Sequence, residues 1–429
     1  MAFLSDPINF IANWLESVMV GFGWSEVVVN AVLKFLGAGA VGTFGLALVV
    51  FTIWLERKLY ARIQDRLGPN RVGPWGIFQT FPDMIKIFTK EYITPDGADK
   101  VVYNLAPILS VSAVLLIWAV IPFAPTVIGT DVNIGVLYIV AVGAAGTLSI
   151  IMAGWSSNNK YALLGAFRAV AQMVSYEVPM VLSLLVPVLL GQTMGINSLV
   201  ASQQVWYIAM VPIAALIFFI SSLAETGRAP FDLLEAESEI VAGFQTEYSG
   251  LKFGMFYVGE FLHAFTISAL TATLFLGGWR GPGAEQYPIL GFVWFFTKTW
   301  AVYVLGLLIR FTIPRFRIDQ MMNINWKLLT PLSLAAVMMI ALVDKGTQQG
   351  HFLIRWAALF VSNVLIWLVA MLALHGEQAL TDMGMFFTKA AFLTIGGAYA
   401  VLPYLYQGGV EHFQWLTGPQ MLDGLALCE

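Results

Sequence analysis

The chain has 429 residues, of which 59% are hydrophobic and only 11% charged, and its formal net charge is −4. Soluble domains have roughly a quarter of their residues charged, so this composition excludes an ordinary soluble enzyme. One cysteine, Cys428, and four histidines exclude an intrachain disulfide, a four-cysteine zinc site and an iron–sulfur cluster held by this chain alone. A charge balance this close to neutral gives no indication of nucleic-acid binding.

Apolar runs of about twenty residues, the length needed to cross ~30 Å of hydrocarbon, recur along the chain. Residues 1–23 have no Lys or Arg ahead of their apolar residues, so we expect no signal peptide. The runs predict an all-α, polytopic transmembrane helix bundle with ten candidate spans. The ten predicted spans are 31–55, 104–124, 132–155, 161–190, 203–223, 254–278, 288–311, 328–343, 353–374 and 385–406.

Connections rich in lysine and arginine alternate along the chain with connections that have few or none. Sixteen of the 22 basic residues lie in four alternate connections, 56–103, 156–168, 224–253 and 310–327. Cytoplasmic connections are enriched in Lys and Arg, so we expect these four to be cytoplasmic and the N-terminus to lie outside. We find no internal repeat, low-complexity tract or Gly/Ser linker in the sequence, which favours one membrane domain.

The first basic connection contains a Gly/Pro/Asn cluster over residues 68–74, which predicts a turn. After this turn, apolar residues recur every three or four positions, and charged residues occupy much of the remainder. The apolar positions are Ile77, Phe81, Met84, Ile85 and Phe88. This pattern predicts an amphipathic helix in the membrane interface. The helix either packs on the bundle or forms a wall for a lipid-soluble ligand, and the pattern alone leaves both open.

The connection 224–253 is acidic, although topology favours basic residues there. Pro230 suits the first position of a helix, on which Asp232, Glu235 and Glu239 would share one face. Like charges one turn apart oppose each other by a few tenths of a kcal/mol, which favours raised pKa values and proton exchange near neutral pH. A solvated acidic loop is the alternative interpretation.

Two carboxylates fall inside predicted spans. Glu177 lies roughly 13.5 Å beyond Arg168 along a helix, and Glu260 lies about two turns into its span with His263 on the same face. A charge at such depth costs on the order of 2.5–3.5 kcal/mol, so both side chains are expected to face the bundle interior or water. Proton or ion handling is the default function, and a structural interhelical hydrogen bond is the alternative.

Eight short segments then carry a family resemblance: LERK at 55–58, GPNRVGP at 68–74, SNNKYALLG at 157–165, RAVAQ at 168–172, SYE at 175–177, AETGRAPFD at 224–232, EAESE at 235–239 and PRFR at 314–317. In this order, over residues 31–343, they resemble the quinone-proximal membrane subunit (the H subunit) of respiratory complex I, the proton-pumping NADH:quinone oxidoreductase. Gly227 and Ala236 stand where the family usually has Asn and Gly. Family members usually end soon after the eighth span, which divides the chain into an H-subunit-like domain, 1–343, and an extension with one or two added transmembrane helices, 344–429.

The resemblance implies a membrane subunit that forms the membrane part of the quinone cavity, with an acidic path that couples quinone reduction to proton pumping. By motif position, the cavity residues are Glu56, Arg57, Arg66, Asp83 and Arg310. The path residues are Glu177, Glu225, Asp232, Glu235, Glu237, Glu239, Glu247 and Glu260. The amphipathic helix would flank the lipid-facing entrance of the cavity.

The resemblance also implies that quinone is a substrate and that this chain binds no cofactor or metal, because flavin and iron–sulfur clusters belong to partner subunits. The implied partners are the peripheral-arm subunits of the quinone site and neighbouring small membrane subunits, in the bacterial plasma (inner) membrane. The chain is then a component of an oxidoreductase and translocase, with no complete redox active site. Two alternatives stay open: the equivalent subunit of a membrane-bound hydrogenase, and an ion-coupled secondary transporter, for which inverted repeats are expected.

Overall fold

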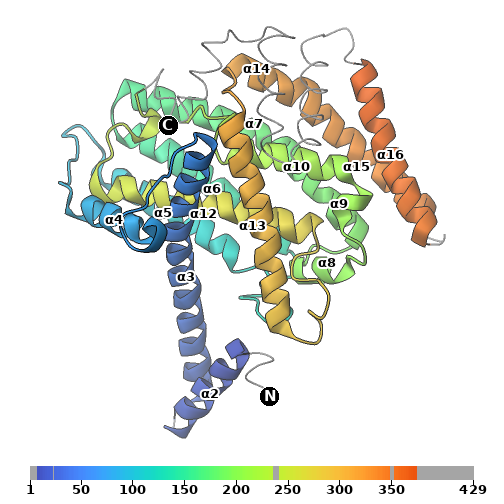
Figure 1. The fold of residues 1–429 in the computed structure, drawn as a ribbon, viewed down its shortest axis with the longest axis horizontal. Coiled ribbons are helices and arrows are strands. Elements are labelled where there is room, and N and C mark those ends of the chain that lie inside the picture. Colours follow the sequence, from blue (N-terminus) through green and yellow to red (C-terminus); the bar gives the residue numbers. More distant parts are fainter. Residues whose placement is uncertain (1–6, 23, 235–240, 348–351, 374–429) are drawn as a thin grey trace. The chain divides into compact units, whose positions relative to one another are not determined.

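The computed structural model describes residues 7–22, 24–234, 241–347 and 352–373, and these residues form helices and loops without a strand (Figure 1). Seven of the described helices are long and apolar enough to cross a membrane. The prediction of an all-α, polytopic membrane bundle is therefore confirmed. The chain forms two compact units: unit 1 comprises 1–167, 187–207 and 240–303, and unit 2 comprises 168–186, 208–239 and 304–429.

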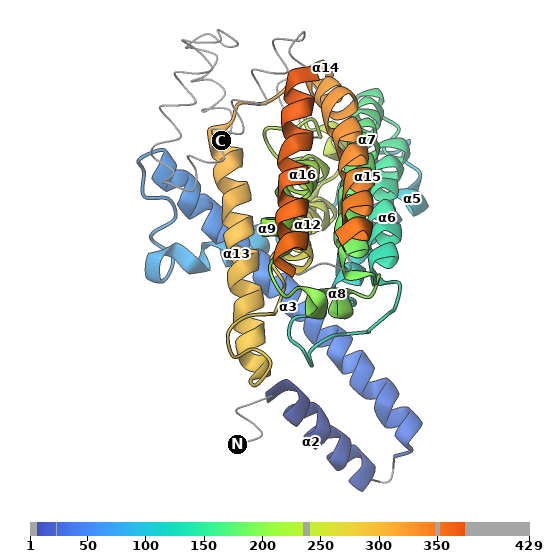
Figure 2. The same cartoon turned by 90° about the vertical axis from the view of Figure 1, so that its right-hand side faces the viewer.

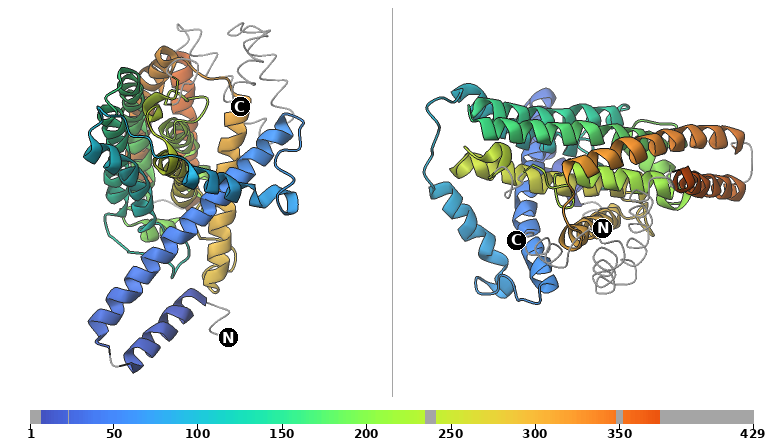
Figure 3. Two further views of the ribbon diagram at one scale, coloured as in Figure 1. Left: turned by 90° about the vertical axis from the view of Figure 1, so that its left-hand side faces the viewer. Right: turned by 90° about the horizontal axis from the view of Figure 1, so that it is seen from above.

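Unit 1 begins with two helices that run back along each other, α2 (Pro7–Gly21) and α3 (Glu26–Ile63) (Figure 3, left). A short 3₁₀ helix, η1 (Pro74–Gln79), and α4 (Thr80–Thr89) follow, so the predicted amphipathic helix is confirmed. The remaining helices that belong wholly to this unit are α5 (Lys100–Trp118), α6 (Gly135–Ser156), α8 (Ile196–Ser202), η2 (Gly243–Gln245) and α12 (Gly250–Phe275). Helices α7 (Lys160–Gly191), α9 (Tyr207–Met210) and α13 (Pro288–Thr312) contribute residues to both units.

Helix α12 is the core of unit 1, because 83% of its most apolar stretch is buried and α3, α4, α5 and α8 pack against it. Small residues allow the close approach: a Cβ added to Gly259 would lie 2.9 Å from the Ser110 hydroxyl of α5. The indole of Trp118 donates to the Thr266 hydroxyl at 2.5 Å. Helix α12 is thereby fixed by both packing and a buried hydrogen bond.

Unit 2 contains α10 (Pro212–Glu225), α14 (Ile318–Asn323), a π-helical turn η3 (Ile324–Leu329), α15 (Thr330–Thr347) and α16 (Phe352–Ala373). The segment from α14 to α15 forms one candidate span over residues 318–347. The helical segment that contains the eighth predicted span, 328–343, is therefore much longer than hydropathy indicated. Two side-chain hydrogen bonds join α7 to the residues at and just before the π turn. Tyr176 of α7 donates to the Met321 carbonyl of α14 at 2.9 Å, and Asn325 in the π turn donates to the Ser175 carbonyl of α7 at 2.6 Å. A side-chain hydrogen bond to a helix carbonyl, like that to Met321, is a recognised cause of a local departure from α geometry.

The first four predicted spans, the sixth and the seventh each coincide with one helix. The fifth, 203–223, was wrong as a single helix, because the chain breaks between α9 and α10 at Val211. Pro212 cannot donate a backbone hydrogen bond, and it begins α10 instead of continuing α9. The ninth, 353–374, coincides with α16, whereas the tenth, 385–406, lies outside the described residues.

Helix α16 packs against α15 (Figure 2), and a buried ion pair joins them. The Nε and Nη2 atoms of Arg355 lie 2.6 and 2.5 Å from Oδ1 of Asp344, whose side chain is 8% exposed. A two-pronged guanidinium contact fixes both distance and orientation. The first helix of the predicted extension is therefore attached to the last helix of the H-subunit-like part.

We predict that Arg355→Met destabilises unit 2 by about 3–5 kcal/mol, because it removes both guanidinium contacts from a buried carboxylate. Thermal unfolding of the detergent-solubilised complex measures the loss. Arg317→Met is the matched control, since Arg317 lies 3.8 Å from Asp319 with both side chains exposed, and such pairs contribute under about 1 kcal/mol. The double variant Asp344→Leu/Arg355→Met should recover most of the stability. Equal melting temperatures for the two single variants would contradict the prediction.

Candidate functional site

A neutral amide holds the acidic connection of unit 2 in place. Gln172 of α7 is fully buried, and its Nε2 donates to the carbonyls of Ala224 at 2.6 Å and Phe231 at 2.7 Å. The first acceptor is the penultimate residue of α10 and the second lies seven residues later, so one side chain bridges the whole turn. Gly227 within it has a φ of +65°, a conformation that Gly and Asn tolerate best. Gly227 also leaves room for Leu234, because a Cβ at this position would clash with the Leu234 side chain.

The predicted helix from Pro230 was wrong over residues 230–234, which form turns, bends and irregular backbone. The carbonyl of Pro230 accepts a hydrogen bond from the Phe316 amide at 2.9 Å, and that of Phe231 accepts from Gln172. Contacts with distant segments thus take the carbonyls that a helix would have used. Asp232 consequently does not lie on a helix face, and Glu235, Glu237, Glu239 and Ala236 lie outside the described residues.

Two of the predicted path carboxylates in unit 2 lie near each other. Glu177 follows Tyr176 on α7, Glu225 is the last residue of α10, and their charges interact electrostatically. Gln172 precedes Glu177 by five residues, about 7.5 Å along the helix. The clamp that positions the acidic turn therefore lies close to the intramembrane acid on the same helix.

Polar side chains on one face of α7 contact this region and the π turn. Gln172, Ser175 and Tyr176 lie at i, i+3 and i+4, where they share a face, and all three are buried. Within the described residues, Oε1 of Gln172 and Oδ1 of Asn325 have no hydrogen-bond partner, although both side chains are 0% exposed. Buried polar atoms of this kind are normally satisfied by ordered water. Neither Gln172 nor Asn325 was among the predicted site residues, although the i, i+3, i+4 polar spacing on α7 was a usable signal for Gln172.

In unit 1, the structure brings together two of the predicted cavity residues. Nη1 of Arg57, near the end of α3, lies 2.5 Å from Oδ2 of Asp83 in the first turn of α4. The Thr80 hydroxyl also donates to the Val50 carbonyl at 3.2 Å. These contacts orient α4 against α3, and they leave Phe81, Ile85 and Phe88 exposed along one side of α4.

The other predicted cavity residues are distributed differently. Glu56 adjoins Arg57 on α3, and Arg66 in the following turn donates to the Gln64 side chain at 2.6 Å, with its guanidinium 5.4 Å from the Tyr60 ring centre. Arg310 is in the last turn of α13 and belongs to unit 2. The described residues contain no group of three or more metal-ligating side chains arranged around a common point.

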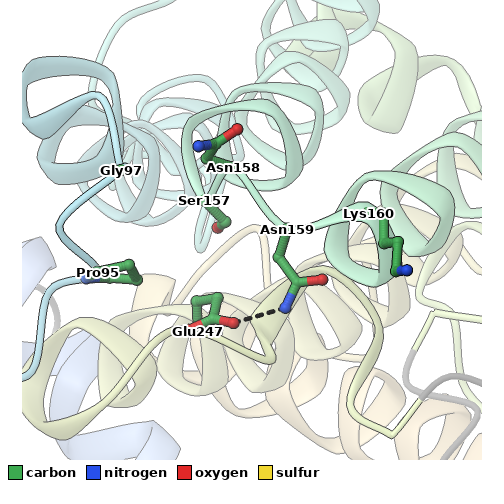
Figure 4. A pocket seen from close by; sticks show the side chains of 7 residues that line it. All are labelled: Pro95, Gly97, Ser157, Asn158, Asn159, Lys160 and Glu247. Atoms are coloured by element: carbon green, nitrogen blue, oxygen red, sulfur yellow. Dashed lines mark hydrogen bonds between the residues drawn. The ribbon is translucent and has the colours of Figure 1, made fainter.

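Glu247 and Glu260 lie in unit 1 rather than with Glu177, Glu225 and Asp232 in unit 2. The Glu247 carboxylate accepts a hydrogen bond from Nδ2 of Asn159 at 2.6 Å, at the wall of a surface cleft (Figure 4). Glu260 is half-buried on the core helix α12. The five path residues that the structure describes are therefore divided between the two units, with three in unit 2 and two in unit 1.

The NADH dehydrogenase family model matches residues 37–341. The H subunit of NADH-quinone oxidoreductase from Dehalococcoides mccartyi strain CBDB1 is 48% identical over 318 residues, which cover 74% of this chain and 87% of that protein. The chain belongs to the family of NADH-quinone oxidoreductase H subunits. The relative from Carboxydothermus hydrogenoformans is 44% identical, over 76% of this chain and 92% of that protein, and the relative from Geobacillus sp. strain WCH70 is 43% identical, over 75% and 96%.

The predicted resemblance is thus confirmed, and family membership makes the chain a multi-pass membrane subunit rather than a complete enzyme. Neither the hydrogenase subunit nor the secondary transporter is favoured by these relatives. The NADH dehydrogenase match includes Gln172, Asn325 and the described path and cavity residues, whereas α16 lies beyond it. A second family model, described as chromate transporter, matches residues 381–429, which lie outside the described part of the chain.

We predict that Gln172→Leu frees the acidic turn of unit 2 without unfolding the bundle. The change removes two hydrogen bonds to the turn, which contribute about 0.5–1.5 kcal/mol each, so backbone amides over residues 226–234 should exchange with deuterium about tenfold faster. Mass spectrometry of the purified complex measures this exchange.

Gln203→Leu is the matched control, because Gln203 makes the same double contact elsewhere, to the carbonyls of Thr273 and Leu274. Its substitution should increase exchange near the end of α12 and leave residues 226–234 unchanged. Unaltered exchange of residues 226–234 in Gln172→Leu would show that the clamp is dispensable.

Proposed function

We propose that the chain is the membrane subunit of a proton-translocating NADH:quinone oxidoreductase that forms the membrane part of the quinone cavity and an acidic path from it. Family membership supports the assignment to this complex, with quinone as substrate. The single observation that supports the path is the Gln172 clamp, because it holds the turn bearing Glu225 and Asp232 against the helix that carries Glu177.

The path operates through coupled protonation. Two interacting carboxylates in a poorly solvated region do not ionise independently, so uptake of a proton by one favours release by the other. Glu177 and Glu225 are such a pair. The unsatisfied oxygens of Gln172 and Asn325 support ordered water along the same face of α7, which would carry protons between carboxylates that do not touch.

The quinone cavity is assigned to Glu56, Arg57, Arg66, Asp83 and Arg310. The Arg57–Asp83 pair supports this assignment, since it presents hydrogen-bonding groups beside the exposed apolar side of α4. A quinone has an apolar tail and two carbonyl oxygens, and reduction adds two electrons and two protons to the ring. In this proposal α4 guides the tail, polar groups orient the head, and partner subunits that carry flavin and iron–sulfur clusters supply the electrons.

The remaining predictions are part of the same proposal. The basic connections face the cytoplasm, where peripheral-arm subunits dock, and the N-terminus lies outside, in a bacterial plasma membrane. Small membrane subunits adjoin the bundle. Glu235, Glu237 and Glu239 continue the path beyond Asp232, and Glu247 and Glu260 extend it in unit 1. Residues 344–429 add one or two transmembrane helices, of which α16 is the first.

The assignment to the complex is tested by extracting the tagged chain from its native membrane in mild detergent. Copurification with flavin and iron–sulfur subunits, and NADH:quinone reductase activity blocked by a quinone-site inhibitor, are the expected results. A nickel-containing partner without NADH oxidation would identify a hydrogenase instead. Recovery of the chain alone, with ion-coupled uptake, would identify a transporter.

We predict that Glu177→Gln and Glu225→Gln each lower coupled proton pumping at least tenfold while the complex still assembles, because each removes one titrating member of the pair. Proton uptake by reconstituted vesicles, at matched complex content, measures the effect. Glu285→Gln is the control, since Glu285 is an exposed loop carboxylate. Full pumping by the double variant would exclude both residues from the path.

We predict that Asp83→Asn raises the KM for quinone up to about fivefold, with a smaller change in kcat. The ion pair is partly exposed, so its loss corresponds to no more than ~1 kcal/mol. Steady-state kinetics with quinones of several tail lengths measure the change. Asp319→Asn, at an exposed ion pair, should leave KM unaltered, and equal KM values for the two variants would remove Asp83 from the cavity.

A further inference from the structure

A polar cleft of about 470 Å³ opens at the surface of unit 1. Three connections that lie far apart in the sequence form it: the loop before α5, the junction of α6 and α7, and the loop before α12 (Figure 4). All three belong to connections predicted to face the cytoplasm. The polar side chains of its lining are Ser157, Asn158, Asn159, Lys160 and Glu247.

The cleft is held in shape by hydrogen bonds rather than by loose loop packing. Asn159 caps α7 by accepting from the Tyr161 amide at 2.9 Å, and it also donates to the Glu247 carboxylate. Beneath Glu247, the rings of Tyr103 and Tyr248 stack with centroids 4.2 Å apart, and Tyr103 donates to the Glu247 carbonyl at 2.7 Å. Burial raises the pKa of the Tyr248 phenol above its usual value, so this support stays uncharged.

The residues next in sequence to the lining, here called the rim, have the composition of a membrane interface. Trp155, at the end of α6, is 68% exposed, and Tyr161, in the first turn of α7, is 52% exposed. Exposed Trp and Tyr mark the level of lipid headgroups in membrane proteins. Val101, four residues after Gly97 of the lining, is exposed as well.

The lining carries one cation and one anion, Lys160 and Glu247. A purely anionic ligand would be attracted by Lys160 and repelled by Glu247, whereas a ligand with both charges satisfies both. The amide of Asn158 and the hydroxyl of Ser157 add neutral hydrogen-bonding groups. The volume falls within the ~300–1,000 Å³ typical of small-molecule sites.

We propose that this cleft binds the headgroup of a phosphatidylethanolamine-type lipid, with its phosphate at Lys160 and its primary ammonium at Glu247. A primary ammonium has three N–H donors for the Glu247 carboxylate, and a quaternary ammonium has none. The acyl chains would then lie on the apolar surface beside Val101 and Trp155. Glu247 is the one residue that this binding site shares with the proposed acidic path, and none of its lining residues belongs to the proposed quinone cavity.

Lipid retention by the purified, delipidated complex tests the proposal. Phosphatidylethanolamine, phosphatidylglycerol and phosphatidylcholine are added back separately, and retained lipid is counted by native mass spectrometry. The unaltered complex should retain at least tenfold more phosphatidylethanolamine than phosphatidylcholine at this site. Lys160→Gln, which removes the contact with the phosphate common to all three headgroups, should lower retention of each lipid at this site, whereas Glu247→Gln should abolish the excess of phosphatidylethanolamine over phosphatidylcholine.

Lys100→Gln is the matched control, because Lys100 is exposed at the start of α5 and does not line the cleft. It should leave the lipid preference unchanged. Absence of any headgroup preference in the unaltered complex, or the same result for Lys160→Gln and Lys100→Gln, would overturn the proposal. These measurements do not depend on quinone reductase activity.

A photoreactive benzoylphenylalanine in place of Tyr161 identifies what covers the rim in the intact complex. A covalent adduct with phosphatidylethanolamine is the expected product, and Lys160→Gln should reduce its yield. An adduct with another subunit would show that a protein segment occupies the cleft, which would overturn the proposal.

Discussion

A buried backbone carbonyl with poor hydrogen bonding costs free energy, and the candidate path of unit 2 depends on how the turn after α10 avoids this cost. The chain leaves helical geometry after Glu225, where the carbonyls of Ala224 and Phe231 accept only short-range backbone hydrogen bonds, from Gly227 at 3.2 Å and Leu233 at 3.0 Å. Gln172 adds a second donor to both through one amide group. The turn that bears Glu225 and Asp232 can therefore be irregular while its buried carbonyls stay well hydrogen-bonded.

In unit 1, too, polar side chains donate hydrogen bonds to backbone carbonyls at the end of a buried helix. Lys298 donates to the carbonyls of Leu276, Gly278 and Arg280 at 2.7–3.0 Å, beyond the end of α12. Gln203 donates to two further carbonyls of that helix. Helix ends inside the bundle are thus closed by side chains from other helices, and polar residues in apolar spans need not be catalytic.

Hydropathy predicted most spans because each of those helices contains a long apolar stretch, and the amphipathic pattern predicted α4. It did not predict the break at Pro212, because a proline inside an apolar run is often tolerated within a membrane helix. The helix expected from Pro230 had the correct local pattern, but the Phe316 amide and Gln172 compete for its carbonyls. Those two donors come from segments distant in the sequence, so no local signal could reveal them.

The chemistry of the clamp also bears on how the proposed path could respond to quinone reduction. Gln172 is neutral, so its two hydrogen bonds stay intact whether Glu177 and Glu225 are protonated or ionised. A charged clamp, such as a lysine, would gain and lose strength with each proton transferred and would move the backbone with it. With a neutral clamp, the carboxylates can change charge while the turn keeps its position, so their coupling is electrostatic. Replacement of Gln172 should consequently alter the spacing of the acids, whereas replacement of an acid should alter the charge and leave the turn in place.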